Sequence, residues 1–256
     1  PGDVRGAPGK LGGDRGVGKG THGRVGRRLT TFPPLPILRG PTHPRTPGPM
    51  ARKPHGIFCL EADWWSDFNR TSTVQPVLHL LEQGMRTEVP HVHRDVGTRE
   101  ELALYLGRWA QRGNAQYRIL YLAFHGGPGH ISLGDRRRKG SDISLDELAE
   151  MLGTGLSGRL VHFGSCETLR VDRRLIRRFL DRTGLVAASG FRTPVDWLDS
   201  AVFEVLLFEI MLRYTLTIQG ARAVRTTMRK EHPAMCRRHD FRMVVRLPKR
   251  RKKPKA

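Results

Sequence analysis

The chain has 256 residues, which is enough for one large domain or two small ones. It carries 45 Lys and Arg residues against 24 Asp and Glu residues, a net charge of +21 that would normally indicate a nucleic acid or another anionic partner. Residues 1–49, residues 50–245 and residues 246–256 each carry a net charge of +7. The middle of the chain is therefore only mildly basic, and a nucleic-acid module is not indicated there.

The cysteine count and the hydropathy exclude further classes of protein. Three cysteines, Cys59, Cys166 and Cys236, contain no C-x-x-C pair, which argues against a disulfide scaffold and a structural zinc site and favours a reducing cytoplasm. Glu204 and Glu209 interrupt the most hydrophobic helical segment, so no apolar run is long enough to span a membrane. We expect a cytoplasmic protein without a membrane span or a cleaved secretory signal.

The two ends of the chain differ in composition from the middle. Residues 1–49 contain twelve Gly and nine Pro and can bury too little apolar surface to form a core, so we expect this segment to be disordered. It begins with Pro1, and Met50 directly precedes the first patterned segment, so the alternative that it is upstream sequence foreign to the native protein stays open. Residues 248–256 form a basic tail. Arg outnumbers Lys by 36 to 9, which suggests a GC-rich bacterial source.

From residue 50 onward, short apolar runs alternate with amphipathic segments. A strand is predicted at 56–62, a helix at 74–84 and a second strand at 87–96. Thr98 and Glu101 form a capping box that predicts the start of the next helix.

The alternation continues to the end of the patterned region. Strands are predicted at 117–124, 159–165, 185–189 and 241–247. Helices are predicted to begin at Ser144 and Asp172 and to cover 197–216 and 218–230. This order predicts an α/β fold for residues 50–247: a three-layer sandwich in which a mostly parallel sheet of about six strands has helices on both faces.

Two strand ends carry the residues that point to chemistry. The third strand leads into His125-Gly126-Gly127-Pro128-Gly129, and the fourth leads into Cys166-Glu167-Thr168. Ligands of open α/β sheets bind beyond the carboxyl ends of the strands. If the two strands are neighbours, a thiol nucleophile, a proton carrier and backbone N–H donors meet at one edge of the sheet. Taken singly, a His or Cys after a strand is more often structural.

A hydrophobic strand ending in His-Gly, followed about 40 residues later by one ending in Ser-Cys-Glu-Thr, resembles the caspase-fold cysteine peptidases. These include caspases, metacaspases, separases and bacterial CHAT-domain proteins, and the likeness to CHAT-domain proteins is the closest. The resemblance covers roughly residues 57–247. It implies Cys166 as nucleophile, His125 as acid and base, and the backbone N–H groups of Gly126 and Cys166 as oxyanion donors.

The same resemblance implies cleavage of a protein or peptide substrate without a cofactor. Because the two catalytic groups need not form a tight ion pair in this family, His125 is expected mainly to protonate the leaving amine. The chain shows no repeat array or sensor domain like those that many CHAT proteins carry. Dependence on an activating partner therefore stays open.

The segment after the fifth strand suggests a preference for basic residues. Asp196, Trp197 and Asp199 follow that strand at the same edge of the sheet, and an acidic pocket selects Arg or Lys in peptidases related to separases and metacaspases. The alternative is a purely structural role, in which Asp199 caps the long helix. Arg192, which lies nearby in the sequence, would instead favour an acidic side chain in the substrate.

The remaining cysteines and histidines are interpreted structurally. Cys59 is expected to be buried in the first strand, and Cys236 to lie in a basic loop. His91-x-His93 is half of a metal site, but no third ligand is evident, so no metal is expected. His162 is expected to pack in the core.

His130 and the basic run that follows it lie between the His-Gly motif and the next predicted helix. His130 lies close enough to the His-Gly motif to line the crevice. The basic run 136–139 is expected to form a solvated loop.

Three alternatives to a cysteine peptidase stay open. His-Gly-Gly-Pro-Gly also resembles the oxyanion loop of serine α/β-hydrolases such as proline iminopeptidases, but a G-x-S-x-G elbow is missing around Ser165. A non-catalytic caspase-like scaffold is the second alternative. The third is a nucleic-acid-associated protein that binds through its basic tail.

Overall fold

The computed structural model describes residues 55–65, 69, 72–85, 88–134 and 140–248. All of them belong to one compact unit, Met50–Ala256. The expectations for residues 1–49, for the basic run 136–139 and for residues 249–256 of the tail lie outside the described residues.

The strands of the main sheet and the helices between them follow one another along the chain in the predicted order. The strands are β1 (Gly56–Glu61), β2 (His91–Asp95), β3 (Tyr117–Ala123), β4 (His125–Gly127), β5 (His130–Ser132), β6 (Asp142–Ser144), β7 (Leu160–Phe163), β8 (Ala187–Gly190) and β9 (Arg242–Val245). The helices are α1 (Gln75–Gly84), α2 (Arg99–Ala110), α3 (Leu145–Leu152), α4 (Arg173–Thr183), α5 (Trp197–Arg213), α6 (Ile218–Glu231) and α7 (Pro233–Arg238), with a 3-10 turn at Arg112–Asn114.

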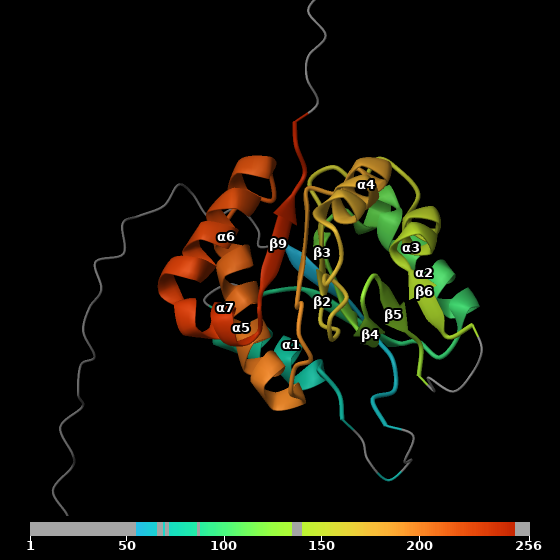
Figure 1. The fold of residues 1–256 in the computed structure, drawn as a ribbon, viewed down its shortest axis with the longest axis horizontal. Coiled ribbons are helices and arrows are strands. Elements are labelled where there is room, and N and C mark those ends of the chain that lie inside the picture. Colours follow the sequence, from blue (N-terminus) through green and yellow to red (C-terminus); the bar gives the residue numbers. More distant parts are fainter. Residues whose placement is uncertain (1–54, 66–68, 70–71, 86–87, 135–139, 249–256) are drawn as a thin grey trace, which may run out of the picture. The chain divides into compact units, whose positions relative to one another are not determined.

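Six strands form the main sheet in the order β2-β1-β3-β7-β8-β9. The first five are parallel to their neighbours, and β9 pairs antiparallel with β8. Helices lie on both sides of this sheet (Figure 1). The predicted three-layer α/β sandwich with a mostly parallel sheet is therefore confirmed.

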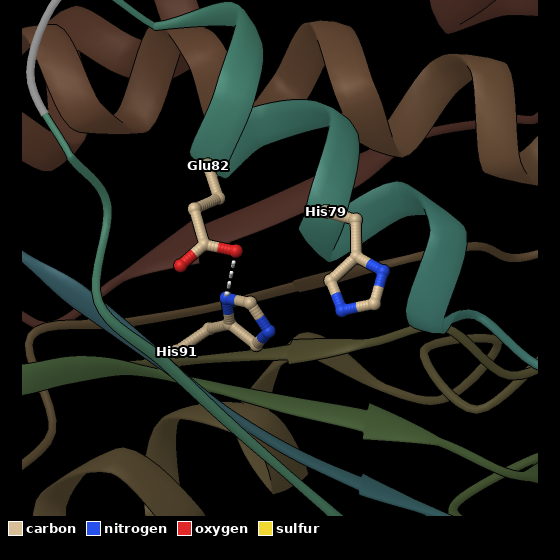
Figure 2. A group of neighbouring side chains, drawn as sticks. All are labelled: His79, Glu82 and His91. Carbon is tan, nitrogen blue, oxygen red and sulfur yellow. Dashed lines mark ion pairs between the residues drawn. The ribbon is translucent and has the colours of Figure 1, made fainter.

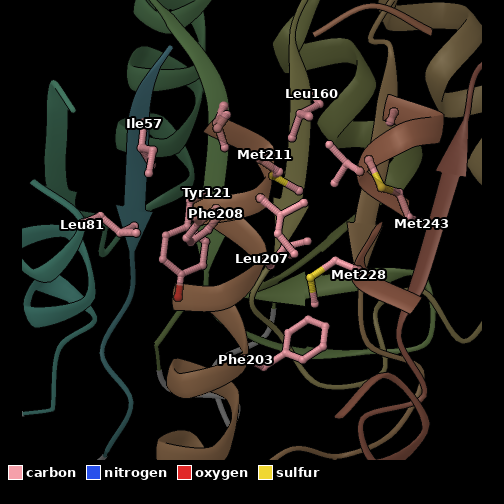
Figure 3. Packing of buried hydrophobic residues seen from close by; sticks show 14 of the residues in the cluster. Ile57, Leu81, Tyr121, Leu160, Phe203, Leu207, Phe208, Met211, Met228 and Met243 are labelled. Atoms are coloured by element: carbon pink, nitrogen blue, oxygen red, sulfur yellow. The ribbon is translucent and has the colours of Figure 1, made fainter. Parts of the chain in front are cut away.

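Alternate residues of each strand pack into different cores. Ile57, Tyr121 and Leu160 face α1, α5 and α6, and Figure 3 shows them in the same core as Phe208 and Met211 of α5. The opposite face of the sheet packs against α2, α3 and α4. Strands buried on both faces need near-continuous apolar runs, which is why the sequence marks them clearly.

Helix starts follow the capping signals in the sequence. Thr98 with Glu101 and Ser144 with Glu147 form the two predicted capping boxes, in which side chains satisfy free N–H groups of the first turn. Asp172 caps α4 by accepting a bond from the N–H of Arg174. The starts of α2, α3 and α4 are thus confirmed.

Several details differ from the prediction. The second strand is shorter than 87–96, and α5 ends at Arg213 rather than at 216. Cys236 lies in helix α7 and not in a loop, because Pro233 occupies the first turn, where its missing N–H costs nothing. A second sheet, β4-β5-β6, was not predicted. Within the described part of the chain, no helix is both long and apolar enough to cross a membrane.

Candidate functional site

The two motifs singled out in the sequence follow neighbouring strands. β3 pairs in parallel with β7, and their carboxyl ends lie at the same edge of the sheet. His125 opens β4 two residues after β3 ends, and Cys166 follows β7 after Gly164 and Ser165. The condition that the two strands are neighbours is therefore met.

The His-Gly segment and the Ser-Cys segment are in direct contact. A Cβ atom added to Gly126 would lie 2.5 Å from the hydroxyl oxygen of Thr168, 2.9 Å from Cβ of Ser165 and 3.0 Å from the carbonyl oxygen of Cys166. No side chain fits at this position, so glycine is required for the close approach of the two backbones.

Ser165 and Thr168 hold the Cys166 segment on the small sheet. Their hydroxyl oxygens are 2.6 Å apart, and both side chains are fully buried. The Thr168 hydroxyl also donates to the carbonyl of His130, at 2.9 Å, and the N–H of Gly129 donates to the carbonyl of Thr168, at 3.1 Å. The residues around Cys166 in the Ser-Cys-Glu-Thr string thus fix the position of the loop.

His125 is oriented by the backbone of Trp64. Its Nε2 atom lies 2.8 Å from the carbonyl oxygen of Trp64, and the two rings meet edge to face. A carbonyl only accepts hydrogen bonds, so Nε2 carries the proton and Nδ1 of the neutral ring is the basic nitrogen. Half-buried His125 is thereby held in one tautomer.

Glu61, at the carboxyl end of β1, holds the segment that contains Trp64. The buried carboxylate accepts hydrogen bonds from the indole of Trp64, the hydroxyl of Thr73 and the N–H of Val74, and it pairs with His93 at 2.6 Å. Sequence reasoning missed this residue. The available signal was an acidic side chain at the end of an otherwise apolar strand, since a buried carboxylate is almost always paired.

His125 and Cys166 line one cavity of about 210 Å³. Three indole rings form part of its wall, and the described lining residues are Trp64, Trp65, His125, Gly164, Cys166, Val195, Asp196, Trp197 and Ser200. The N–H of Val195 donates to Sγ of Cys166 at 3.4 Å. A half-buried thiol and an imidazole therefore share an apolar hollow at the edge of the sheet.

The predicted substrate-binding residues have different positions. Asp196 and Trp197 line the cavity, and the indole nitrogen of Trp197 is buried without a hydrogen-bond partner among the described residues. Asp199 is not among the described lining residues and forms an ion pair with Arg238. The cap of α5 is Asp196 rather than Asp199, because its carboxylate accepts bonds from the N–H groups of Leu198 and Asp199.

The other two cysteines have different surroundings. Cys59 is fully buried in β1, and burial, together with the nearby carboxylate of Glu61, raises the pKa of its thiol well above the usual range. Cys236 donates to the carbonyl of Met228, and burial raises the pKa of its thiol as well. Neither lines the cavity that contains His125.

His162 lies in the core, as predicted. It is fully buried in β7, where its ring contacts the carboxylate of Glu204 at 3.1 Å and the hydroxyl of Ser189 at 3.0 Å. Tyr121 donates to the same carboxylate. Burial and that carboxylate raise the pKa of Tyr121 well above its usual range.

This buried network lies directly beneath the Cys166 loop. A Cβ atom on Gly164 would meet the ring of Tyr121 at 2.6 Å and Oε1 of Glu204 at 2.7 Å. His130 packs against Gly127 and is not among the described residues that line the cavity.

His91 and His93 do not form a common ligand pair. His93 contacts Glu61, whereas His91 lies beside His79 and Glu82 of α1. No sequence pattern indicates this second grouping, because its members meet only when α1 packs beside β2.

Comparison with known proteins identifies a family for the chain. No curated protein is found to match the chain. The model of a family of unknown function, DUF6642, matches residues 54–245, which covers both strand-end motifs and the nine strands of the described residues. The chain belongs to this family of unknown function, DUF6642.

Proposed function

We propose that the protein is a cysteine endopeptidase of the caspase type, with Cys166 as nucleophile and His125 as acid and base. The observation that carries the proposal is that both side chains follow adjacent parallel strands and line one cavity. A thiol and an imidazole in a shared hollow are the minimum set for nucleophilic acyl transfer.

The reaction begins when Sγ of Cys166 attacks the carbonyl carbon of the scissile bond and the thiol proton passes to the imidazole of His125. The tetrahedral oxyanion receives hydrogen bonds from the N–H groups of Gly126 and Cys166. Collapse of the intermediate breaks the C–N bond, and His125 protonates the departing amine. Water then hydrolyses the thioester, releases the carboxylic acid product and restores the thiol.

The lining of the cavity favours a basic side chain next to the scissile bond. Asp196 is the acidic residue among the described lining residues, and the indoles of Trp64, Trp65 and Trp197 offer faces on which a cation can stack. Arg192, the residue that argued for the opposite preference, pairs with Asp240 and lines a different cavity. We therefore infer that Arg or Lys precedes the cleaved bond.

The surroundings of Ser165 weigh against a serine hydrolase. Its side chain is fully buried, and its hydroxyl is bonded to Thr168 rather than to an imidazole. A serine nucleophile needs an adjacent base and access to substrate.

Chemical labelling tests the assignment of the nucleophile. A peptide acyloxymethyl ketone with Arg at its reactive end should modify Cys166 in the folded full-length chain and leave Cys59 and Cys236 unmodified, as read by peptide mass spectrometry. The variant His125→Ala should retain the thiol but label more slowly. Equal labelling of the three cysteines would refute the assignment. Absence of labelling at Cys166 would favour the non-catalytic scaffold.

A cavity rich in arginine favours a second candidate function, the binding of nucleic acid. It measures about 480 Å³ and is lined by Arg173, Arg192, Arg225, Arg229 and Arg242, together with Asp240 and part of β9. Burial and neighbouring guanidinium groups lower the pKa of Arg225 and of Arg242, as expected for cations that lack enough counter-charge. Phosphate groups would supply that charge.

Salt dependence tests this second candidate. The affinity for a DNA oligonucleotide, measured by fluorescence anisotropy, should fall linearly with salt on logarithmic axes. The double variant Arg225→Gln/Arg229→Gln should reduce the slope by about two, because each phosphate contact contributes about one. An unchanged slope would exclude these arginines as the binding surface.

A further inference from the structure

Three metal-binding side chains gather at the edge of the sheet, away from the cavity of Cys166. His79 and Glu82 project from α1 and His91 begins β2, and Figure 2 shows the three side chains turned toward one another. Each offers a ligand atom, and these atoms all lie within 4.8 Å of one another.

The packing of α1 beside β2 creates the group. Val77, Leu78 and Leu81 bury one face of α1 against the sheet. His79 and Glu82 are three residues apart, so they are neighbours on the helix surface. Both are exposed and have room to adjust, whereas the side chain of His91 is only 13% exposed.

His91 has an unsatisfied nitrogen at this place. Its Nδ1 atom is buried and has no hydrogen-bond partner among the described residues. Oε2 of Glu82 lies 3.8 Å from it, which is too far for a hydrogen bond. Buried polar atoms are nearly always satisfied, so an atom left open beside a carboxylate and a second imidazole points to a missing ligand.

We propose that His79, Glu82 and His91 bind a zinc ion. Two imidazoles and one carboxylate are a ligand set that suits Zn²⁺, whereas Mg²⁺ and Ca²⁺ prefer oxygen ligands. In a tetrahedral site with bonds of about 2.0–2.1 Å, neighbouring ligand atoms are roughly 3.3 Å apart. Small movements of the exposed His79 and Glu82 reach this spacing and leave a fourth position for water.

A second group of carboxylates and an imidazole lacks such an unsatisfied ligand atom. Glu61, His93 and Asp95 also lie close together. However, both carboxylate oxygens of Glu61 are already occupied by hydrogen bonds from Trp64, Thr73, Val74 and His93. A metal ion there would have to break these bonds, so the inference is confined to the His91 group.

The site is independent of the proposed peptidase chemistry. His91 pairs in register with Ile57 near the start of β1, at the amino end of the parallel strands, while His125 and Cys166 follow the carboxyl ends. Zinc at this place links α1 directly to the edge strand β2. Because the unfolded chain does not present the three ligands together, bound zinc stabilises the fold.

Calorimetric titration with ZnCl₂ tests the proposal on the full-length chain carrying Cys166→Ser, which removes a competing thiol ligand. We expect one equivalent of Zn²⁺ to bind at this site and to raise the melting temperature by several degrees, and Mg²⁺ to have no effect. Loss of a residue that merely supports a ligand costs about 10–100-fold in affinity, so His79→Ala and Glu82→Gln should each cost at least that much.

The variant His232→Ala is the matched control. It removes a histidine that does not belong to the group of His79, Glu82 and His91, so the affinity for Zn²⁺ should stay unchanged. Circular dichroism verifies that His79→Ala, an exposed helix position, still folds. Absence of zinc binding, or zinc binding whose affinity survives both His79→Ala and Glu82→Gln, would overturn the proposal.

Discussion

Asp196 combines two roles that single substitutions can separate. Its carboxylate caps α5 and also lines the cavity next to Cys166. Asparagine caps helices about as well as aspartate but carries no charge. The variant Asp196→Asn therefore keeps the helix start and removes the negative charge from the cavity.

We expect Asp196→Asn to lower kcat/KM for peptides with Arg before the cleaved bond by about 10–100-fold, since a hydrogen bond to a charged group is worth about 1.5–3 kcal/mol. Peptides with an apolar residue at that position should be affected little. Asp199→Asn is the control, because that carboxylate pairs with Arg238 instead. Unchanged selectivity in Asp196→Asn would exclude the acidic pocket.

At the scale of single residues, the sequence predicted those side chains that follow apolar strands. His125 and Cys166 were found because parallel strands align their carboxyl ends. Glu61 and Trp64 were not found, since their contacts join segments whose spacing in the sequence follows no period. Glu204 was noticed only as a break in a hydrophobic helix, whereas the structure shows it bound to Tyr121 and His162 in the core.

Among the elements, the start of α3 carries a pH-dependent contribution to stability. Hydrogen bonds from the N–H and the hydroxyl of Ser144, followed by Arg99, lower the pKa of Glu147 from 4.5 to about 2. A carboxyl whose pKa is lowered by folding stabilises the protein above its ordinary pKa. This contribution is lost as the pH falls from about 4.5 toward 2.

Glu147→Gln should therefore weaken the loss of stability between pH 5 and pH 3, measured by urea unfolding at both values. Glutamine can still form the capping box, so the helix start is kept while the charge is removed. Glu100→Gln, at an exposed position of α2, serves as control and should behave as the parent chain does. An identical pH dependence in Glu147→Gln and the parent would contradict this explanation.

The elements themselves were predictable where a local signal exists. Apolar runs marked the strands of the main sheet other than the edge strand β2, whose sequence HVHRD is mostly polar, and Thr98 and Ser144 marked two helix starts. The strands β4, β5 and β6 have three residues each, which is too short to show a period of two. The loop expected around Cys236 is instead helix α7, whose six residues are too few to show a helical period.

For the whole molecule, strand order decides whether the chemistry is possible. β3 and β7 are adjacent although residues 124–159 separate them in the chain, and the small sheet β4-β5-β6 occupies part of that interval. The alternation of elements predicted the layers, but the contact of α1 with β2 that gathers His79, Glu82 and His91 depends on tertiary packing. Sequence periodicity carries no information about such lateral contacts.

Peptide cleavage tests the central claim most directly. The full-length chain should be incubated with a peptide library, alongside Cys166→Ser and His125→Ala, and the products read by mass spectrometry. We expect cleavage after Arg or Lys by the parent chain and a loss of several orders of magnitude in rate in both variants. Cleavage that persists undiminished in Cys166→Ser, or no cleavage of any peptide by the parent, would contradict the assignment of the protein as a cysteine peptidase.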